Sequence, residues 1–277
     1  MSKLKKALEK AKETRGEENE AVVQAEQARP STSLSQIEKE MERPQEEIKP
    51  TYRQTKVINI NQEYLRKNKI VSLFYQDETA DQIRILRSQV LEKLKESGGN
   101  SILISSPNAG EGKTILAINL AFSIAQEVSR TTLLVDADLR KPFIHRYLGF
   151  EAEQGLSQYL LGEAELPDLL INPGIEKLTI LPGGKPLPSS TELLGAPRMQ
   201  SLVKELKGRY SDRYIIYDTT SLLTRADPIV FSHHIDGIIL IVEAERTSNK
   251  DLQRTMELLK DRPIVGTLFN KARDVGL

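Results

Sequence analysis

The sequence predicts an α/β protein whose doubly wound, mostly parallel sheet follows a disordered N-terminal tail. Apolar runs of strand length alternate with longer helical stretches after Asn100, which is the pattern of a parallel sheet covered by helices on both faces. A glycine-bearing loop joins the first of these strands to its helix, and two later strands end in aspartate. These observations place a ligand site at one edge of the sheet.

The N-terminal segment has the composition of a disordered tail. The first 50 residues hold 10 basic and 11 acidic side chains, and no aromatic residue precedes Tyr52. Such a segment cannot bury enough apolar surface to offset its chain entropy. We therefore expect a tail over residues 1–56 and one domain over residues 57–277. Leu4, Leu8 and Ala11 form an apolar stripe edged by lysines, which suits either a solvated charged helix or a short helix that docks on a partner or a membrane surface.

Six strands are expected from short apolar runs bounded by turn residues. They cover residues 101–105, 132–136, 178–181, 213–218, 237–242 and 265–270. Helices are expected between them, at residues 113–127, 197–207, 227–233 and 249–260. A further helix is expected over residues 80–95, where apolar residues recur every three or four positions. These residues are Ile83, Leu86, Val90 and Leu94.

Composition excludes several kinds of site. The 39 basic and 39 acidic residues cancel, so the chain lacks the global positive field of a protein that binds nucleic acid over its whole surface. The sequence has no cysteine, which excludes disulfides, thiol nucleophiles and thiolate metal sites. With 3 histidines, a zinc cluster is not expected.

The loop SSPNAGEGKT, residues 105–114, indicates phosphate binding. A strand that enters a glycine-bearing loop and then a helix directs several backbone N–H groups at one point, where the helix dipole also favours an anion. Lys113 would reach the β- and γ-phosphates, and Thr114 would place its hydroxyl on Mg²⁺. Pro107 stands where the general P-loop pattern has a small residue. We assign nucleotide binding to Ala109, Gly110, Glu111, Gly112, Lys113, Thr114 and Ile115.

Three aspartates are placed to serve a metal ion or a reaction. Asp136 and Asp138 close the second strand, in LLVDADLRKP, and Asp218 ends the fourth, in YIIYD. Open α/β sheets bind ligands beyond the carboxyl ends of their strands, and Mg²⁺ prefers oxygen ligands. We expect the three carboxylates to lie near Lys113 and Thr114, as metal ligands or as a base.

Together these motifs resemble the bacterial tyrosine kinases of capsule and exopolysaccharide systems, in their cytoplasmic split form. That family is a branch of the ParA/MinD-like P-loop ATPases. The similarity covers roughly residues 76–273, including the GEGKT loop, the DxDLRxP segment and an ELL stretch within residues 181–199. ParA/MinD-type ATPases carry an additional lysine where this chain has Asn108, which disfavours a dimerising partition ATPase.

The resemblance implies ATP and Mg²⁺ as cofactors and gives roles to individual residues. Lys113 would stabilise the γ-phosphate, while Asp136 would orient or deprotonate the attacking hydroxyl. Asp138 would assist at the metal or at a subunit boundary. The expected catalytic residues are thus Lys113, Asp136 and Asp138, and the expected metal ligands are Thr114, Asp138 and Asp218.

Two further residues carry expectations from the resemblance. Asn270 stands where related ATPases use an asparagine to read adenine. Arg140 contacts phosphate, a neighbouring subunit or Asp138, and the sequence does not choose among these.

The resemblance also implies partners. Asp81, Arg84 and Arg87 are similar to a family E-x-x-R-x-x-R helix that is implicated in ring-like self-association, with Asp in place of Glu. A membrane chain-length or co-polymerase protein would supply its cytoplasmic end to activate the kinase. The longest apolar run, residues 237–242, is far shorter than the roughly 20 residues that span a bilayer, and no signal peptide pattern is present. We therefore expect a cytoplasmic protein that reaches the inner membrane only through its partner, and no nucleic-acid partner.

The chain departs from the family in its tyrosines and in one loop. Family kinases end in a tyrosine-rich tail, whereas no tyrosine follows Tyr217 here. Tyr52, Tyr64 and Tyr75 are therefore the expected acceptors, while Tyr214 and Tyr217 are expected in the core. Thr219 and Thr220 replace the usual prolines after Asp218, which alters the stiffness of that loop.

The expected function is a Mg·ATP-dependent protein-tyrosine autokinase that regulates exopolysaccharide or capsule assembly and export. An ATP-hydrolysing switch without kinase activity, which the missing acceptor tyrosines favour, stays open as an alternative. A ParA/MinD-like ATPase and an interaction module with a structural nucleotide are further alternatives.

Overall fold

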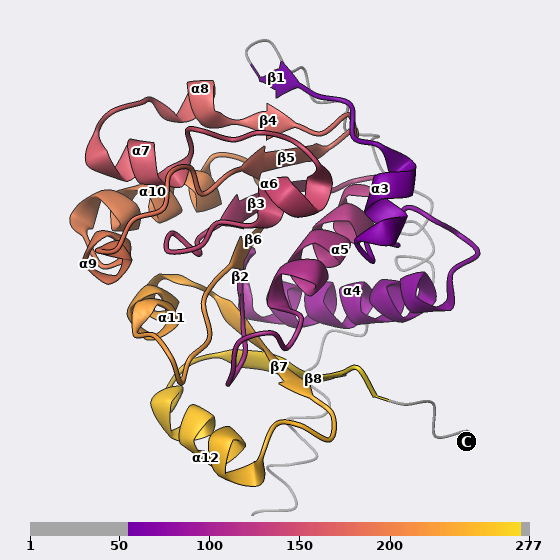
Figure 1. Cartoon of the computed structure of the whole chain (residues 1–277), viewed down its shortest axis with the longest axis vertical. Helices are drawn as coiled ribbons and strands as arrows, with labels where there is room; N and C mark the ends of the chain where they lie inside the picture. The colour runs from indigo at the N-terminus through magenta and orange to yellow at the C-terminus, as the bar shows by residue number, and fades with distance from the viewer. Residues whose placement is uncertain (1–54, 273–277) are drawn as a thin grey trace, which may run out of the picture. The chain divides into compact units, whose positions relative to one another are not determined.

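The computed structural model describes residues 55–272, with a parallel sheet at its centre (Figure 1). The expected tail lies outside these residues except for its last two, Thr55 and Lys56, and Lys56 begins strand β1. The short helix of the tail and Tyr52 also lie outside the described residues. The strand order is β1-β4-β5-β3-β6-β2-β7-β8, and neighbouring strands are parallel except β4 and β5. The strands are β1 (Lys56–Val57), β2 (Ser101–Ser105), β3 (Thr131–Asp136), β4 (Ile171–Asn172), β5 (Leu178–Leu181), β6 (Arg213–Asp218), β7 (Gly237–Glu243) and β8 (Ile264–Asn270).

Helices cover both faces of this sheet, which confirms the doubly wound fold. In Figure 1, α4 and α5 lie on one side and α9 to α12 on the other. The helices are α3 (Gln62–Lys67), α4 (Glu78–Ser97), α5 (Lys113–Ala125), α6 (Ile144–Leu148), α7 (Leu156–Leu161), α8 (Leu166–Leu169), α9 (Ser190–Leu194), α10 (Pro197–Gly208), α11 (Asp227–Phe231) and α12 (Asn249–Leu258), and the 3₁₀ helix η1 spans Ser232–His234.

Successive residues of the central strands enter opposite cores. Ile102 and Ile104 of β2 pack in the core that contains α4 and α5, whereas Leu103 packs in the core that contains α10. Because side chains of a strand alternate between the two faces of its sheet, a strand covered on both faces reads as a continuous apolar run. Tyr214 and Tyr217 of β6 are both buried, as the sequence predicts.

A buried asparagine joins α5 to the segment that precedes α4. The Asn119 Oδ1 atom accepts hydrogen bonds from the backbone N–H groups of Val71 and Ser72, at 2.8 and 3.1 Å. Its Nδ2 atom donates to the carbonyl oxygen of Lys69 at 2.9 Å. The helix that begins at the phosphate-binding loop therefore also fixes the approach to α4.

The helix expected to mediate self-association is engaged within its own chain. Arg87 of α4 donates to the Ser123 carbonyl oxygen at 2.9 Å and pairs with Glu127 at 2.7 Å, both at the end of α5. Arg84 pairs with Asp81, one turn earlier on α4. Arg87 thus faces α5, and the side chain of Asp81 is the most exposed of the three.

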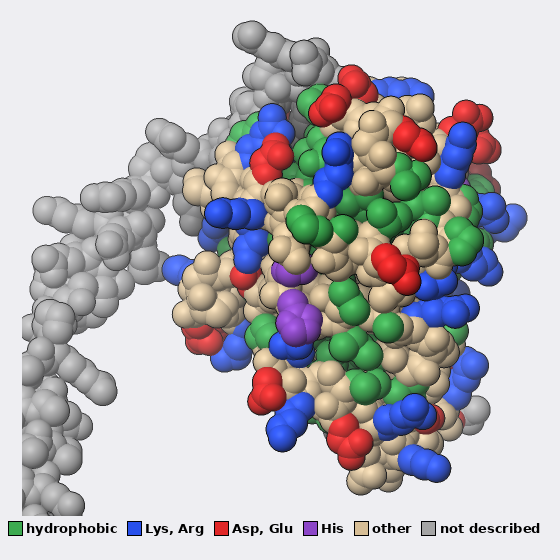
Figure 2. Space-filling model, turned by 90° about the vertical axis from the view of Figure 1, so that its left-hand side faces the viewer, with side chains coloured by type: hydrophobic (Ala, Val, Ile, Leu, Met, Phe, Trp, Pro, Cys, Tyr) green, Lys and Arg blue, Asp and Glu red, His purple; other side chains and the backbone are tan. Residues whose placement is uncertain are grey.

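The face that carries α9 to α12 presents mixed charge. Figure 2 shows Lys and Arg side chains interspersed with Asp and Glu, with hydrophobic side chains between them. This face therefore has no field of a single sign. Within residues 55–272, no helix is both long and apolar enough to cross a membrane.

Candidate nucleotide-binding site

The phosphate-binding loop leads from β2 directly into α5. Gly110 and Gly112 have positive φ angles of 83° and 101°, which glycine adopts without steric cost. No side chain caps the start of α5 at Lys113, so no side chain competes with an anion for its first N–H groups. The Lys113 Nζ atom donates to the Ser106 hydroxyl at 3.1 Å. The loop therefore has the backbone geometry and the cation of a phosphate site.

Asp136 and Asp218 end neighbouring strands and are paired in register across β3 and β6. Both side chains are buried. The Asp136 Oδ2 atom accepts from the N–H groups of Phe143 and Ile144, at 2.9 and 3.0 Å. Asp218 is hydrogen-bonded to Thr114. The Oδ1 atom of each carboxylate is buried without a hydrogen-bond donor.

Burial shifts the pKa values of these groups. Burial and the neighbouring Asp218 raise the pKa of Asp136 well above its usual value, and two backbone N–H groups only partly oppose this. Burial raises the pKa of Asp218 to about 7, against the opposing effects of Thr114 and Lys113. Burial lowers the pKa of Lys113, and the surrounding carboxylates oppose that shift. Such paired, displaced pKa values are typical of functional sites.

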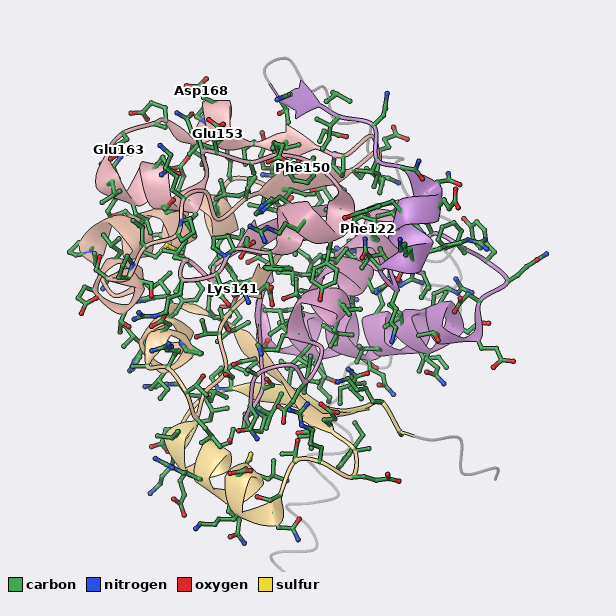
Figure 3. The ribbon with its side chains drawn as sticks, viewed as in Figure 1. Phe122, Lys141, Phe150, Glu153, Glu163 and Asp168 are labelled. Atoms are coloured by element: carbon green, nitrogen blue, oxygen red, sulfur yellow. The ribbon has the colours of Figure 1, made fainter. Side chains whose placement is uncertain are left out.

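Asp138 lies beyond the end of β3, not on the strand. Its Oδ1 atom accepts from the Lys141 N–H at 3.0 Å, and burial raises its pKa, which that N–H and Lys113 partly offset. Figure 3 shows Lys141 on the loop between β3 and α6, apart from Glu153, Glu163 and Asp168 around α7 and α8.

Arg140 pairs with Asp227, a partner that the sequence did not indicate. The Arg140 Nε atom donates to Asp227 Oδ2 at 3.2 Å, and the hydroxyls of Ser190 and Thr191 donate to the same carboxylate. Asp227 is fully buried. This network joins the loop after β3 to α9 and α11, through residues 87 positions apart.

Asn270 contacts the phosphate-binding loop. Its Nδ2 atom donates to the Glu111 carbonyl oxygen at 2.8 Å, and its Oδ1 atom accepts from the Lys271 N–H at 3.0 Å. The Lys271 Nζ atom donates to the Gly110 carbonyl oxygen at 2.9 Å and pairs with Glu243 at 3.0 Å. The end of β8 therefore holds two carbonyl groups of the loop. The sequence did not predict the contact of Lys271 with the loop, although Lys271 directly follows Asn270.

The sequence also did not predict the residues that contact the Glu111 side chain, which is 1% exposed. Its Oε1 atom accepts from the Thr247 hydroxyl at 2.6 Å, and its Oε2 atom accepts from the Asn108 N–H at 3.0 Å. Thr247 lies 136 positions from Glu111, in the loop between β7 and α12. No local pattern marks a contact of that separation.

The loop after Asp218 is tied to β2. The Thr219 hydroxyl donates to the Ile104 carbonyl oxygen at 2.9 Å, and the Ser105 hydroxyl donates to the Thr220 carbonyl oxygen at 2.8 Å. The Thr219 hydroxyl therefore makes a hydrogen bond to β2 that a proline at this position could not supply, because proline has no side-chain donor.

The donor set fits ATP and Mg²⁺. A hydroxyl beside a buried carboxylate, with two carboxylate oxygens that lack donors, is the oxygen-rich environment that Mg²⁺ requires. Thr114 and Asp218 are the residues that would hold the ion. Among residues 55–272, no group of three or more His, Cys, Asp or Glu side chains is arranged to hold a metal alone, and Mg²⁺ at such sites commonly relies on substrate phosphates and water.

Comparison with known proteins finds similarity to bacterial tyrosine-protein kinases. No family model matches the chain. It is 29% identical over 208 residues to tyrosine-protein kinase YwqD of Bacillus subtilis, covering 74% of this chain and 86% of YwqD. It is 29% identical over 201 residues to tyrosine-protein kinase CpsD of Streptococcus agalactiae, covering 71% of this chain and 84% of CpsD. Tyrosine-protein kinase ptk of Acinetobacter johnsonii is 27% identical over 226 residues, or 80% of this chain, which spans only 30% of that relative.

Solved structures agree with these relatives. The chimerical protein CapA2B2 is 27% identical, with a TM-score of 0.69 over 81% of this chain and 95% of its own. A ParA family ATPase from Chlorobium tepidum is 21% identical, with a TM-score of 0.51 over 63% of this chain and 75% of its own, and it shares the fold. The chain is thus similar in sequence to bacterial tyrosine-protein kinases and similar in fold to the CapA2B2 structure.

Proposed function

We propose that this chain is a Mg·ATP-dependent protein-tyrosine autokinase that regulates exopolysaccharide or capsule polymerisation and export. One observation carries the proposal. Lys113 and Thr114 start the helix after β2. Asp218 ends β6, which lies beside β2 in the sheet, and Asp136 ends β3, which lies beside β6. Phosphoryl transfer needs a positioned nucleotide, a metal and an oriented hydroxyl, and these residues are of the types that supply them.

Nucleotide binding is assigned to the loop. The backbone of residues 109–115 would surround the phosphates, and Lys113 would stabilise charge on the γ-phosphate. Thr114 and Asp218 would hold Mg²⁺, with Asp138 assisting. When bound, Mg²⁺ supplies charge neutralisation at the phosphates. Asn270, whose amide already contacts the loop, would carry adenine recognition.

Asp136 is assigned the role of accepting the proton of the tyrosine hydroxyl. Its Oδ2 atom is fixed by two backbone N–H groups, and its buried Oδ1 atom has no donor, so Oδ1 is the oxygen that would accept the proton. In the transfer, the tyrosine hydroxyl oxygen bonds to the γ-phosphorus and the bond to the β–γ bridging oxygen breaks. ADP leaves, and the hydroxyl proton passes to Asp136. A raised pKa suits a carboxylate that must hold a proton.

Tyr75 is the acceptor that the described residues favour. Its side chain is 77% exposed. Tyr64 lies on α3, is 41% exposed and donates its hydroxyl to the Arg146 carbonyl oxygen at 2.9 Å. A free hydroxyl can enter a neighbouring active site, whereas the Tyr64 hydroxyl must first leave its acceptor.

Partners are proposed from the same family. A membrane chain-length or co-polymerase protein of a polysaccharide export system would present its cytoplasmic end to this domain. Self-association would use α4, the helix that carries Asp81, Arg84 and Arg87. We place the protein in the cytoplasm, at the membrane only through this partner.

An ATP-hydrolysing switch without kinase activity is the second candidate. It is favoured by the engaged hydroxyl of Tyr64 and by the burial of Tyr214 and Tyr217, which disfavour three tyrosines within residues 55–272 as acceptors. A ParA/MinD-like ATPase has less support, because Asn108 stands in place of the additional lysine and binds Glu111 of its own chain.

The deciding experiment is incubation of the purified full chain with Mg²⁺ and γ-labelled ATP, with and without the cytoplasmic end of a candidate membrane partner. Phosphotyrosine that disappears in Lys113→Met supports the kinase. Free phosphate without phosphotyrosine supports the switch and removes the kinase assignment.

A further inference from the structure

We propose that Thr247 is a positioning residue for the nucleotide: its hydroxyl holds the buried Glu111 carboxylate and thereby fixes the phosphate-binding loop. The inference rests on the proposed ATP site and adds to it a residue far away in sequence. Thr247 lies on the loop between β7 and α12 and belongs to none of the motifs discussed above.

Glu111 places a buried carboxylate within the phosphate-binding loop. Its negative charge lies close enough to Lys113 to influence the pKa of that lysine, and among residues 55–272 no Lys or Arg forms an ion pair with it. A buried carboxylate without a cation must be stabilised by hydrogen-bond donors. The donors are the hydroxyl of Thr247 and the backbone and side-chain N–H groups of Asn108.

Thr247 is itself held in place by the end of β7. Its Oγ1 atom accepts from the Glu243 N–H at 3.0 Å, and its own N–H donates to the Glu243 carbonyl oxygen at 3.0 Å. Because the oxygen already accepts from Glu243, its hydrogen is directed to Glu111. The strand beside β2 thus sets where the loop carboxylate lies.

Removal of this hydroxyl affects the site through the backbone of the loop. The Oε1 atom of Glu111 would keep only the long contact of 3.5 Å to Asn108 Nδ2. A buried acceptor that loses its donor destabilises the conformation that buries it. Glu111 stands between Gly110 and Gly112, so a shift of its side chain moves the residues that would surround the phosphates.

Three variants of the full chain test this role, with Mg²⁺ and a non-hydrolysable ATP analogue as the probe. Thr247→Val removes the hydroxyl, and we expect affinity to fall about tenfold. Thr247→Ser keeps the hydroxyl and should restore affinity to within about twofold of wild type. Thr255→Val is the matched control, because Thr255 is buried on α12 and its Oγ1 atom has no hydrogen-bond partner; its affinity should equal wild type.

A Glu111→Gln background separates positioning from a general loss of stability. If Thr247 acts through Glu111, Thr247→Val and Glu111→Gln are non-additive, and the second change adds much less than tenfold. The ligand-free unfolding temperature of each variant is measured beside its affinity.

The outcomes are distinct. The inference would be overturned if a folded Thr247→Val protein bound the analogue with wild-type affinity. It would also be overturned if Thr247→Ser bound as weakly as Thr247→Val. Neither result would count against the ATP site. Additive effects of Thr247→Val and Glu111→Gln would also overturn the inference, and this comparison uses Thr247→Ala if Thr247→Val does not fold. A wild-type chain that does not bind the analogue would overturn the proposed function itself.

Discussion

Asp136 and Asp218 are register partners on β3 and β6, and each keeps one buried oxygen without a donor. Burial raises both pKa values, with added repulsion from Asp218 at Asp136 and from Asp138 at Asp218, so the ligand-free site is held at a cost in folding free energy. Substitutions can distinguish the roles of the two carboxylates, because Asp136 would accept the proton and Asp218 would bind the metal.

We expect Asp136→Asn and Asp218→Asn each to stabilise the ligand-free protein by about 1 kcal/mol, since an amide relieves the repulsion at nearly the same volume. Denaturant unfolding without nucleotide or metal measures this. Asp136→Asn should still bind Mg·ATP but lose about a hundredfold or more in transfer rate, whereas Asp218→Asn should lose the Mg²⁺ dependence of binding. Destabilisation by both changes would contradict the repulsion.

The two glycines of the loop give a matched pair. A Cβ atom at Gly112 would lie 2.2 Å from the Nδ2 atom of Asn270, whereas at Gly110 the nearest atom is Arg246 Nη1 at 3.7 Å. Both positions have positive φ, which costs an alanine about 1 kcal/mol. Gly112→Ala must also displace Asn270 from the Glu111 carbonyl oxygen.

We therefore expect Gly112→Ala to weaken ATP binding at least about tenfold more than Gly110→Ala. Calorimetric titration of both variants checks this. Equal losses would mean that the contact with Asn270 has no part in shaping the loop.

The Arg140–Asp227 network predicts that the stability of the fold decreases at acidic pH. Burial alone would raise the pKa of Asp227, but hydrogen bonds from Ser190, Thr191 and Arg140 outweigh it and hold the pKa below its usual value. A depressed folded-state pKa stabilises the fold above the unfolded value of about 3.9, and that stabilisation is lost as pH falls through the folded-state pKa.

We expect Arg140→Gln to lower the free energy of unfolding at pH 7 by about 2 kcal/mol and to reduce its dependence on pH below about 4. Unfolding curves between pH 7 and pH 3 measure both effects. Arg209→Gln is the control, because the Arg209–Glu205 pair is half-exposed, at 3.5 Å, and such pairs contribute less than about 1 kcal/mol. A loss in the control as large as in Arg140→Gln would refute the network.

Exposure of the tyrosines predicts where phosphate is incorporated. Tyr75 is 77% exposed and Tyr210 is 44% exposed, and an arginine lies over each ring. We expect Tyr75→Phe to remove most of the phosphotyrosine formed within residues 55–272, and Tyr210→Phe to leave it unchanged. Mass-spectrometric mapping after incubation with Mg·ATP decides between them. Phosphate that persists at Tyr64 or Tyr210 in Tyr75→Phe would count against the choice of acceptor.

The strands were predictable because burial on both faces makes each one a continuous apolar run. The structure has all six expected strands, with ends that differ by one residue at most, and all five expected helices. The elements missed are short, such as α6 and α9, and 5 residues each are too few to show a helical period. β1 and β4, of 2 residues each, carry no strand pattern at all.

The site was less predictable, because its supporting contacts are distant in sequence. The loop and the strand-end aspartates are local patterns, so their positions followed from the strand order. The partners of Arg140 and Glu111 depend on which loops the sheet brings together, through contacts 87 and 136 positions apart. Asp136 and Asp138 were expected together at the close of the strand, but β3 ends at Asp136 and Asp138 lies beyond it.

The ties of Arg87 to the end of α5 have a consequence for assembly. A neighbouring subunit that binds this guanidinium would have to release it from Ser123 and Glu127, so new contacts would replace existing ones. If the new contacts were of similar strength, each subunit would gain little net free energy, and self-association through this side chain would be readily reversible. Because α5 begins at the phosphate-binding loop, nucleotide loading and subunit exchange would act on opposite ends of one helix.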